Sequence, residues 1–190
     1  MMQRIEALKS IYSQLEECVV VTIMGAVAAE LQSLGHRPSF FYLQHSMGLA
    51  SSLGLGIALC RPELKVVVLD GDGSLLMNLG SLTTLAQYGP ANLVHLVFDN
   101  ESLVSTGGSP TATARGCDLA AIARAAGIRR ATEVATLEAF EDAFREALAA
   151  EGFSTIVGKV EDKGPEVYLT DLKLLENRFQ FERYLRKVSV

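Results

Sequence analysis

The chain has 190 residues, 49% of them hydrophobic, a mean hydropathy of +0.25 and a formal net charge of −5. This length favours one domain with its own core, and the negative charge excludes a general attraction to nucleic acid or to an anionic membrane surface. Three widely spaced cysteines, Cys18, Cys60 and Cys117, form no CxxC or zinc-binding pattern, so we expect free thiols.

The hydrophobic segments are short. None approaches the roughly 18 to 20 residues that a membrane-spanning helix needs. The N-terminal Met-Met-Gln-Arg-Ile-Glu has no apolar stretch of the kind found in signal peptides. We therefore expect a cytoplasmic protein that binds neither membranes nor nucleic acid.

Apolar runs alternate with segments of helical spacing along the whole chain. The polar, glycine-bearing residues 101–114 are expected to be a loop, and Asn78 is expected to cap the helix that follows it. In chain order we predict a helix over 4–15, a strand over 18–23, a helix over 25–34, a strand over 40–43, a helix over 48–60, a strand over 65–69, a helix over 79–88, a strand over 92–98, helices over 118–126 and 137–149, a strand over 155–160 and a C-terminal helix at about 171–187.

The predicted strands are solidly apolar and do not alternate with polar residues, which is typical of a parallel sheet covered on both faces. The expected fold is therefore α/β, with three layers, a parallel sheet and helices on both sides. Residues 1–190 are expected to form a single domain.

Polar turns follow three of the predicted strands. Residues 44–48, 70–74 and 99–100 each come directly after an apolar run. Ligands bind at the carboxyl ends of the strands in open parallel sheets, so we expect these turns to meet at one crevice.

The turn Gly71-Asp72-Gly73-Ser74 joins two glycines, which let a phosphate approach the backbone, to a carboxylate that suits Mg²⁺ or Ca²⁺. By itself it is also compatible with an ordinary tight turn. An EF-hand is excluded, because Leu75 and Ser81 stand where that loop needs Gly and Glu. Asn100 lies 28 positions after Asp72, and the two oxygens can share one Mg²⁺ whose remaining ligands come from a diphosphate.

Gly71-Asp72-Gly73 followed by Asn100 resembles the motif of enzymes that depend on thiamine diphosphate (ThDP). Within them, the chain is similar to the phosphonopyruvate and sulfopyruvate decarboxylases, and its length resembles that of the β subunit of two-subunit sulfopyruvate decarboxylases. The segments that carry the resemblance are 41–42, 46–52, 71–81, 105–108, 110–111 and 178–179.

The resemblance implies a ThDP-binding domain of the pyrophosphate type, with Mg²⁺ held by Asp72, by the side-chain oxygen of Asn100 and by the backbone carbonyl of Ser102. It also implies that Met47 is the large apolar residue beneath the cofactor that imposes its bent shape. The cofactor-binding residues implied in this way are Ser46, Met47, Gly48, Gly71, Asp72, Gly73, Ser74, Asn100 and Ser102.

His45 departs from the pattern, because relatives usually have Gly before Ser-Met-Gly. It is the candidate catalytic residue, as a proton donor or anion binder. The alternative is that its imidazole fills space beside the cofactor. For an acidic substrate tail, Arg115 and the loop over 105–111 are candidate contacts, although the sequence around Arg115 fits a solvated surface residue better.

The family also needs a Glu that activates the cofactor and belongs to a separate pyrimidine-binding domain. Glu30 and Glu101 are nearest in position, and neither matches that motif. The resemblance therefore implies a partner subunit with that domain, in a hetero-oligomer with a dimeric core. The implied reaction is decarboxylation of a small acidic 2-oxo acid resembling sulfopyruvate or phosphonopyruvate.

Two alternatives stay open: a ThDP-dependent carboligase subunit similar to acetolactate synthase, and a non-catalytic ThDP-binding module. Three scattered cysteines cannot hold the iron–sulfur cluster of related oxidoreductases. Gly54-Leu55-Gly56 lacks the third glycine and the preceding strand of a nicotinamide-binding motif.

Overall fold

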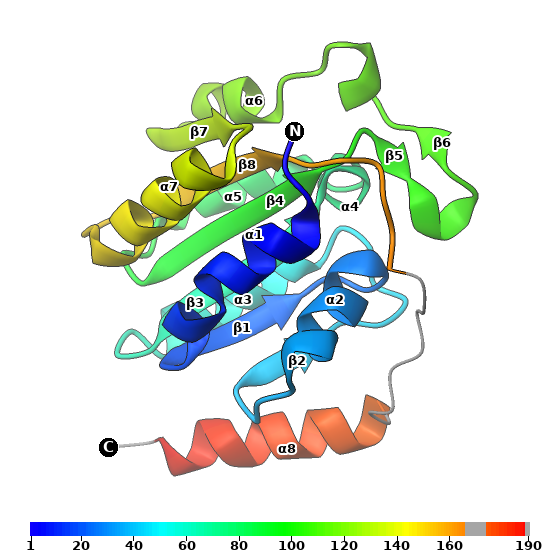
Figure 1. The fold of residues 1–190 in the computed structure, drawn as a ribbon. Helices are drawn as coiled ribbons and strands as arrows, with labels where there is room; N and C mark the ends of the chain where they lie inside the picture. Colours follow the sequence, from blue (N-terminus) through cyan, green and yellow to red (C-terminus); the bar gives the residue numbers. More distant parts are fainter. Residues whose placement is uncertain (166–173, 189–190) are drawn as a thin grey trace.

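The computed structural model describes residues 1–165 and 174–188. Its centre is a six-stranded sheet in which every neighbouring pair is parallel, as predicted (Figure 1). In spatial order the strands are β2 (Phe40–Tyr42), β1 (Cys18–Thr22), β3 (Lys65–Gly71), β4 (Leu93–Asp99), β8 (Ser154–Lys159) and β7 (Arg130–Val134).

Helices cover both faces of this sheet, which confirms the three-layer α/β fold (Figure 1). On one face lie α1 (Arg4–Ile11), α2 (Ala26–Leu34) and α7 (Leu137–Ala149). On the other lie α3 (Ala50–Cys60), α5 (Gly80–Tyr88) and α6 (Leu119–Ala125). All five residues of β1 and all seven of β4 are buried, because apolar side chains on both faces of these strands meet helices. No helix in the described part of the chain is long and apolar enough to cross a membrane.

The last helix, α8 (Leu174–Lys187), runs along the free edge of β2 (Figure 1). Asn177 accepts a hydrogen bond from the Tyr42 backbone N–H at 3.0 Å and donates one to the Phe40 carbonyl at 2.8 Å. Its side-chain amide therefore replaces a neighbouring strand, and the edge of β2 is closed to pairing with other chains. Residues 171–173 of the predicted C-terminal helix lie outside the described residues.

Several local expectations needed correction. The helix predicted over 4–15 ends as the 3-10 turn η1 (Tyr12–Leu15), and strand β7 was missed. Asn78 does not cap α5: the N-cap residue is Leu79, no side chain caps this helix, and the Asn78 amide nitrogen donates to the Gly48 carbonyl at 2.8 Å. Residues 101–114 are not a plain loop. They contain β5 (Ser102–Leu103), η2 (Val104–Thr106), β6 (Ser109–Pro110) and η3 (Thr113–Arg115), and the short helix α4 (Asp72–Leu76) follows β3.

Candidate active site

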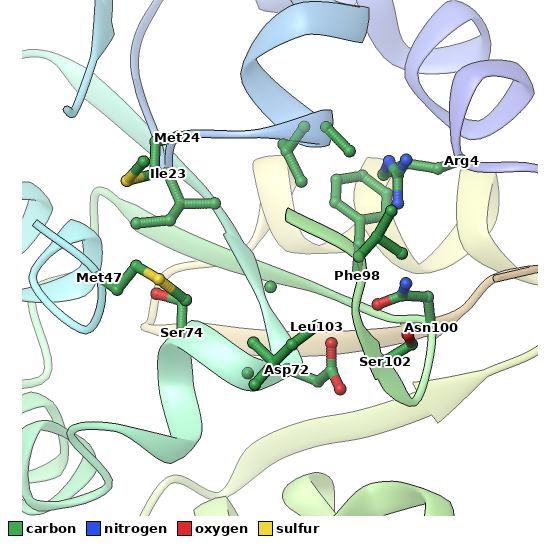
Figure 2. A pocket seen from close by; sticks show the side chains of 15 residues that line it. Arg4, Ile23, Met24, Met47, Asp72, Ser74, Phe98, Asn100, Ser102 and Leu103 are labelled. Carbon is green, nitrogen blue, oxygen red and sulfur yellow. The ribbon is translucent and has the colours of Figure 1, made fainter. Parts of the chain in front are cut away.

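The carboxyl ends of β1, β3 and β4 surround a pocket of about 70 Å³, at the edge of the sheet predicted from the polar turns (Figure 2). The structure brings most of the predicted site residues together there. Those that line the pocket are Met47, Gly71, Asp72, Gly73, Ser74, Asn100 and Ser102. His45, Ser46 and Gly48 belong to the adjoining segment and are not among the lining residues.

Asp72 is 1% exposed and opens α4 directly after β3. Its Oδ2 accepts a hydrogen bond from Thr111 Oγ1 at 2.6 Å, and Thr113 Oγ1, which donates its proton to Asp99 Oδ1 at 2.7 Å, lies 3.3 Å from the same oxygen. No side chain in the ranges that the structure describes donates to Oδ1, and apart from a backbone hydrogen bond from Gly73 to this carboxyl, that oxygen is left for a ligand. Burial raises the pKa of the Asp72 carboxyl, and nearby Asp99 adds to the shift, while the threonine hydrogen bonds act in the opposite direction.

Asn100 follows β4, and its orientation is fixed by a hydrogen bond from Nδ2 to Asp162 Oδ1 at 3.0 Å. Because the amide nitrogen is engaged, the amide oxygen is left for the pocket. Figure 2 shows this oxygen, the Asp72 carboxylate and Ser102 facing a common space.

Ser102 presents two oxygens at this place. Its buried Oγ has no hydrogen-bond partner within residues 1–165 and 174–188. Its strand partner is Pro110, which has no N–H to give to the Ser102 carbonyl, and the adjacent bond runs from Thr111 N to the Glu101 carbonyl. Buried polar groups without partners are uncommon in proteins, so these oxygens indicate a place for a ligand.

Glu101 lies between Asn100 and Ser102 with a positive φ of 60°, a conformation that most residues avoid. It is held there from both ends. Its backbone N–H donates to Asp99 Oδ1 at 3.1 Å, and its carboxylate accepts from Lys159 Nζ at 2.5 Å. The turn that results points both Asn100 and Ser102 at the pocket.

The opposite side of the pocket carries Met47. The Gly48 N–H donates to Ser74 Oγ at 3.0 Å, and Asn78 donates to the Gly48 carbonyl, so this segment is tied to α4. Gly73 packs closely where α4 meets the loop, because a Cβ there would lie 2.2 Å from Leu103 Cδ2 and would force that side chain to move. His45 is exposed and has a φ of 54°, which explains why glycine suits this position.

Arg4 is the cation that sequence reasoning missed. It is 5% exposed and lines the pocket (Figure 2). Its guanidinium group donates to both carboxylate oxygens of Glu30 at 2.9 Å. The helical pattern could have indicated its burial, since Arg4 lies on the same face of α1 as the buried residues Ala7, Leu8 and Ile11. Arg115, proposed for an acidic substrate tail, is exposed and does not line this pocket.

The donors at the pocket are oxygens from a carboxylate, an amide and a backbone carbonyl. Among the described residues, no group of three His, Cys, Asp or Glu side chains is placed to hold a metal ion. A site with few protein ligands suits Mg²⁺, which keeps waters and phosphate oxygens in its coordination shell. The residues present therefore fit Mg²⁺ bound together with a phosphate compound.

Comparison with known families identifies the phosphate compound that this site suits. Residues 24–157 match the family described as "Thiamine pyrophosphate enzyme, C-terminal TPP binding domain". The chain belongs to this family. Its cofactor is therefore ThDP, and the matched residues include every residue that lines the pocket except Arg4 and Ile23.

Similar proteins support this placement in the ThDP family. The chain is 41% identical over 158 residues to the sulfopyruvate decarboxylase subunit beta of Methanocaldococcus jannaschii, covering 83% of each chain. It is 39% identical to that of Methanothermobacter thermautotrophicus, covering 99% of this chain and 96% of the other. It is 44% identical to the phosphonopyruvate decarboxylase of Streptomyces viridochromogenes, covering 78% of this chain and 37% of the longer relative.

The fold also matches a solved structure of the same class. The benzoylformate decarboxylase of Polynucleobacter necessarius superposes with a TM-score of 0.68 at 25% identity. The match covers 86% of this chain and 33% of that enzyme, so the chain spans about a third of the larger protein.

Proposed function

We propose that this chain is the ThDP- and Mg²⁺-binding subunit of an enzyme that decarboxylates a small acidic 2-oxo acid resembling sulfopyruvate or phosphonopyruvate. Relatives that are named decarboxylases support the decarboxylase class. The observation that carries the proposal is the placement of Asp72 and Asn100 at adjacent strand ends, each with one oxygen left for the pocket.

In this proposal Asp72 Oδ1, Asn100 Oδ1 and the Ser102 carbonyl hold Mg²⁺. Gly73 and Ser74 stand beside the diphosphate. ThDP supplies the electron sink that lets carbon dioxide leave a 2-oxo acid. The chain's share is to hold the metal, to shape the cofactor over Met47 and to keep water from the reacting atoms with the apolar wall of the pocket.

His45 is proposed as the residue of this chain that acts on the substrate, as a proton donor or anion binder, with Ser46 and Gly48 completing the segment around Met47. This residue is exposed and lies two positions before Met47, so a substrate held by a second subunit could reach it. Residues 1–190 are proposed to form one ThDP-binding domain of a cytoplasmic enzyme.

The activating Glu is proposed to come from a partner subunit with a pyrimidine-binding domain. Glu30 is occupied by Arg4, and Glu101 is occupied by Lys159, so neither carboxylate is available for that role. A pocket of about 70 Å³ is also well below the ~300 to 1,000 Å³ usual for a bound organic ligand, so further walls are needed.

Apolar surface beside the pocket supports the same partner. Leu49 is 49% exposed and Met77 is 57% exposed, and both adjoin Gly48. An exposed apolar patch of this kind favours contact with another protein. We propose that the assembly is a hetero-oligomer with a dimeric core, in which the partner covers this patch and closes the pocket.

Calorimetric titration tests the proposal. ThDP with Mg²⁺ is titrated into this chain alone and into the chain mixed with a candidate pyrimidine-domain partner. We expect metal-dependent binding in the mixture, loss of binding with Asp72→Ala, and no change with Asp142→Ala, which removes an exposed carboxylate on α7. Absence of binding in a mixture whose association is confirmed contradicts the proposal.

Product analysis separates the remaining alternatives. A decarboxylase releases carbon dioxide and one aldehyde for each 2-oxo acid consumed. A carboligase instead joins the remaining fragment to a second carbonyl compound. A ThDP-binding module without activity binds the cofactor and consumes no 2-oxo acid.

A further inference from the structure

A chain of polar contacts connects strand β8 to the carboxylate of Asp72. Lys159 Nζ donates to Asp99 Oδ2 at 2.9 Å, and Asp99 Oδ1 accepts from Thr113 Oγ1 at 2.7 Å. Thr113 Oγ1 lies 2.8 Å from Thr111 Oγ1, which donates to Asp72 Oδ2 at 2.6 Å. We call Lys159, Asp99, Thr113 and Thr111 the support chain.

The support chain is buried. Asp99 is 1% exposed, Thr113 is 5% exposed and Thr111 is 6% exposed. The Lys159 side chain is 16% exposed and is the cation that neutralises Asp99. Hydrogen bonds in such surroundings are less disturbed by water than surface bonds, so they can fix the orientation of a carboxylate.

Both threonines contact the same oxygen of Asp72. This anchors Oδ2 away from the pocket and turns Oδ1 toward the space shared with Asn100 and Ser102. Thr111 and Thr113 are two residues apart, on the segment after β6, so both hydroxyls reach the same carboxylate.

Lys159 also controls the other half of the site. The same ammonium group contacts Glu101 Oε1 at 2.5 Å, and Glu101 is the positive-φ residue between Asn100 and Ser102. Lys159 therefore anchors the turn that carries two of the oxygen donors, Asn100 and Ser102. Through Asp99 and the two threonines, it also supports the carboxylate of Asp72, which carries the third.

We propose that Thr111, Thr113, Asp99 and Lys159 are positioning residues that set the geometry of the metal site and thereby its affinity for Mg²⁺. This inference rests on the proposed function, because it assumes that Asp72 and Asn100 bind the metal. None of the four residues needs to contact the metal. Loss of such outer hydrogen bonds typically weakens metal binding about 10- to 100-fold.

The test measures metal affinity and not turnover. Mn²⁺ is titrated into the full chain, assembled with its partner and saturated with ThDP, and free Mn²⁺ is followed by electron paramagnetic resonance. Thr113→Val removes the hydroxyl at nearly constant volume, and Thr113→Ser keeps it. Lys159→Met removes the ammonium group, and Lys159→Arg keeps a cation. Thermal unfolding of each metal-free variant verifies that it is folded.

Matched controls are available. Thr83→Val removes an exposed threonine hydroxyl on α5, and Lys9→Met removes a lysine from an exposed ion pair with Glu6. We expect Thr113→Val and Lys159→Met to raise the Kd for Mn²⁺ about 10- to 100-fold. The Thr113→Ser variant and both controls are expected to stay within about threefold of the wild type, and Lys159→Arg is expected to recover most of the affinity.

The outcomes separate the two proposals. If the assembled wild-type protein binds no Mn²⁺ with ThDP, the proposed function fails and this inference fails with it. If the wild type binds Mn²⁺ and the folded Thr113→Val and Lys159→Met variants bind it equally well, the support chain has no positioning role, while the proposed function stands. Equal losses in Thr113→Val and Thr113→Ser would also overturn it, because the hydroxyl would then not be the determinant.

Discussion

The two sides of the pocket are built differently. On the metal side, formed by residues 70–74 and 99–102 with the support chain, Asp72 and Asn100 each have a fixed partner within the chain. The cofactor side, residues 45–48, is tied to the rest of the protein through Gly48, and His45 is exposed with a left-handed backbone. The metal side is therefore organised before any ligand binds.

This difference indicates which side of the pocket is incomplete within this chain. A site that is already hydrogen-bonded can bind its ligand without further ordering. The cofactor side instead borders exposed apolar residues, Leu49 and Met77, which the proposed partner would cover. Substitutions on the metal side should thus act on folding or metal affinity, and substitutions on the cofactor side should act on turnover.

The largest effect is expected at Arg4. Arg4→Met leaves the Glu30 carboxylate buried without its partner, and breaking a buried ion pair in this way costs about 3–5 kcal/mol of stability. Urea unfolding of the metal-free protein measures this loss. Adding Glu30→Leu should recover much of it, because no unpaired charge then remains.

A surface arginine provides the reference for that experiment. Arg145 pairs with Asp142 on α7, and both side chains are more than half exposed. Arg145→Met should change the free energy of unfolding by less than about 1 kcal/mol. A loss as small as this for Arg4→Met would show that the buried Arg4–Glu30 pair contributes no more to stability than an exposed pair.

On the cofactor side, Met47→Ala should leave folding and metal affinity nearly unchanged and lower kcat. A cofactor that is misplaced by about 1 Å can cost roughly 10²-fold in rate. Steady-state kinetics of the assembled enzyme measures this effect, and Met47→Leu should retain most of the activity because it keeps a large apolar side chain. A drop in Mg²⁺ affinity with unchanged kcat would reverse the assignment of the two sides.

The sequence predicted the sheet well where strands are apolar. Both central strands, β3 and β4, were found, together with the polar turns that follow them, because burial on both faces produces continuous hydrophobic runs. Strand β7, with the sequence Arg-Ala-Thr-Glu-Val, was missed because it lies at the edge of the sheet and three of its five residues are exposed. A short strand of mixed polarity gives no periodic signal.

The site was predictable only in part for a similar reason. Asp72 and Asn100 stand in a recognisable motif, whereas Lys159 meets Asp99 from 60 positions away and Asp162 meets Asn100 from 62. Such contacts arise from the order of strands in the sheet, which spacing along one sequence does not reveal. Asn78 shows the same effect. Its side chain was predicted to cap a helix, and instead its amide nitrogen donates to the carbonyl of Gly48, a residue 30 positions away.

His45 tests whether the cofactor side contributes chemistry. His45→Gly should alter stability by about 1 kcal/mol or less, because relief of a left-handed backbone, about 1–2 kcal/mol, is offset by roughly 0.5–1 kcal/mol of added chain entropy in the unfolded state. If the imidazole acts on the substrate, kcat falls at least about tenfold, which corresponds to roughly 1.4 kcal/mol. Unchanged kinetics would leave the imidazole as a space-filling group.

The smallest expected effect is on the metal-free protein. Burial and the neighbouring Asp99 raise the pKa of Asp72 in the folded state, so folding favours the protonated carboxyl. The stabilisation is complete below the pKa of the unfolded chain and is lost as the pH rises through the raised value. Asp72→Asn keeps the shape without the charge, and should raise the Tm of the apoprotein at pH 7 by roughly 2–4 °C, or about 1 kcal/mol.

Thermal unfolding between pH 4 and pH 8 in the presence of a chelator tests this prediction. The Tm difference between Asp72→Asn and the wild type should grow as the pH rises and vanish at the acidic end, where the wild-type carboxyl is protonated as well. With ThDP and Mg²⁺ the order should reverse, because only the carboxylate binds the metal strongly and a ligand that binds the folded state raises its stability. A variant that is less stable at every pH would show that the charge of Asp72 is already compensated within the chain, and that the metal side is organised for an empty site as much as for a filled one.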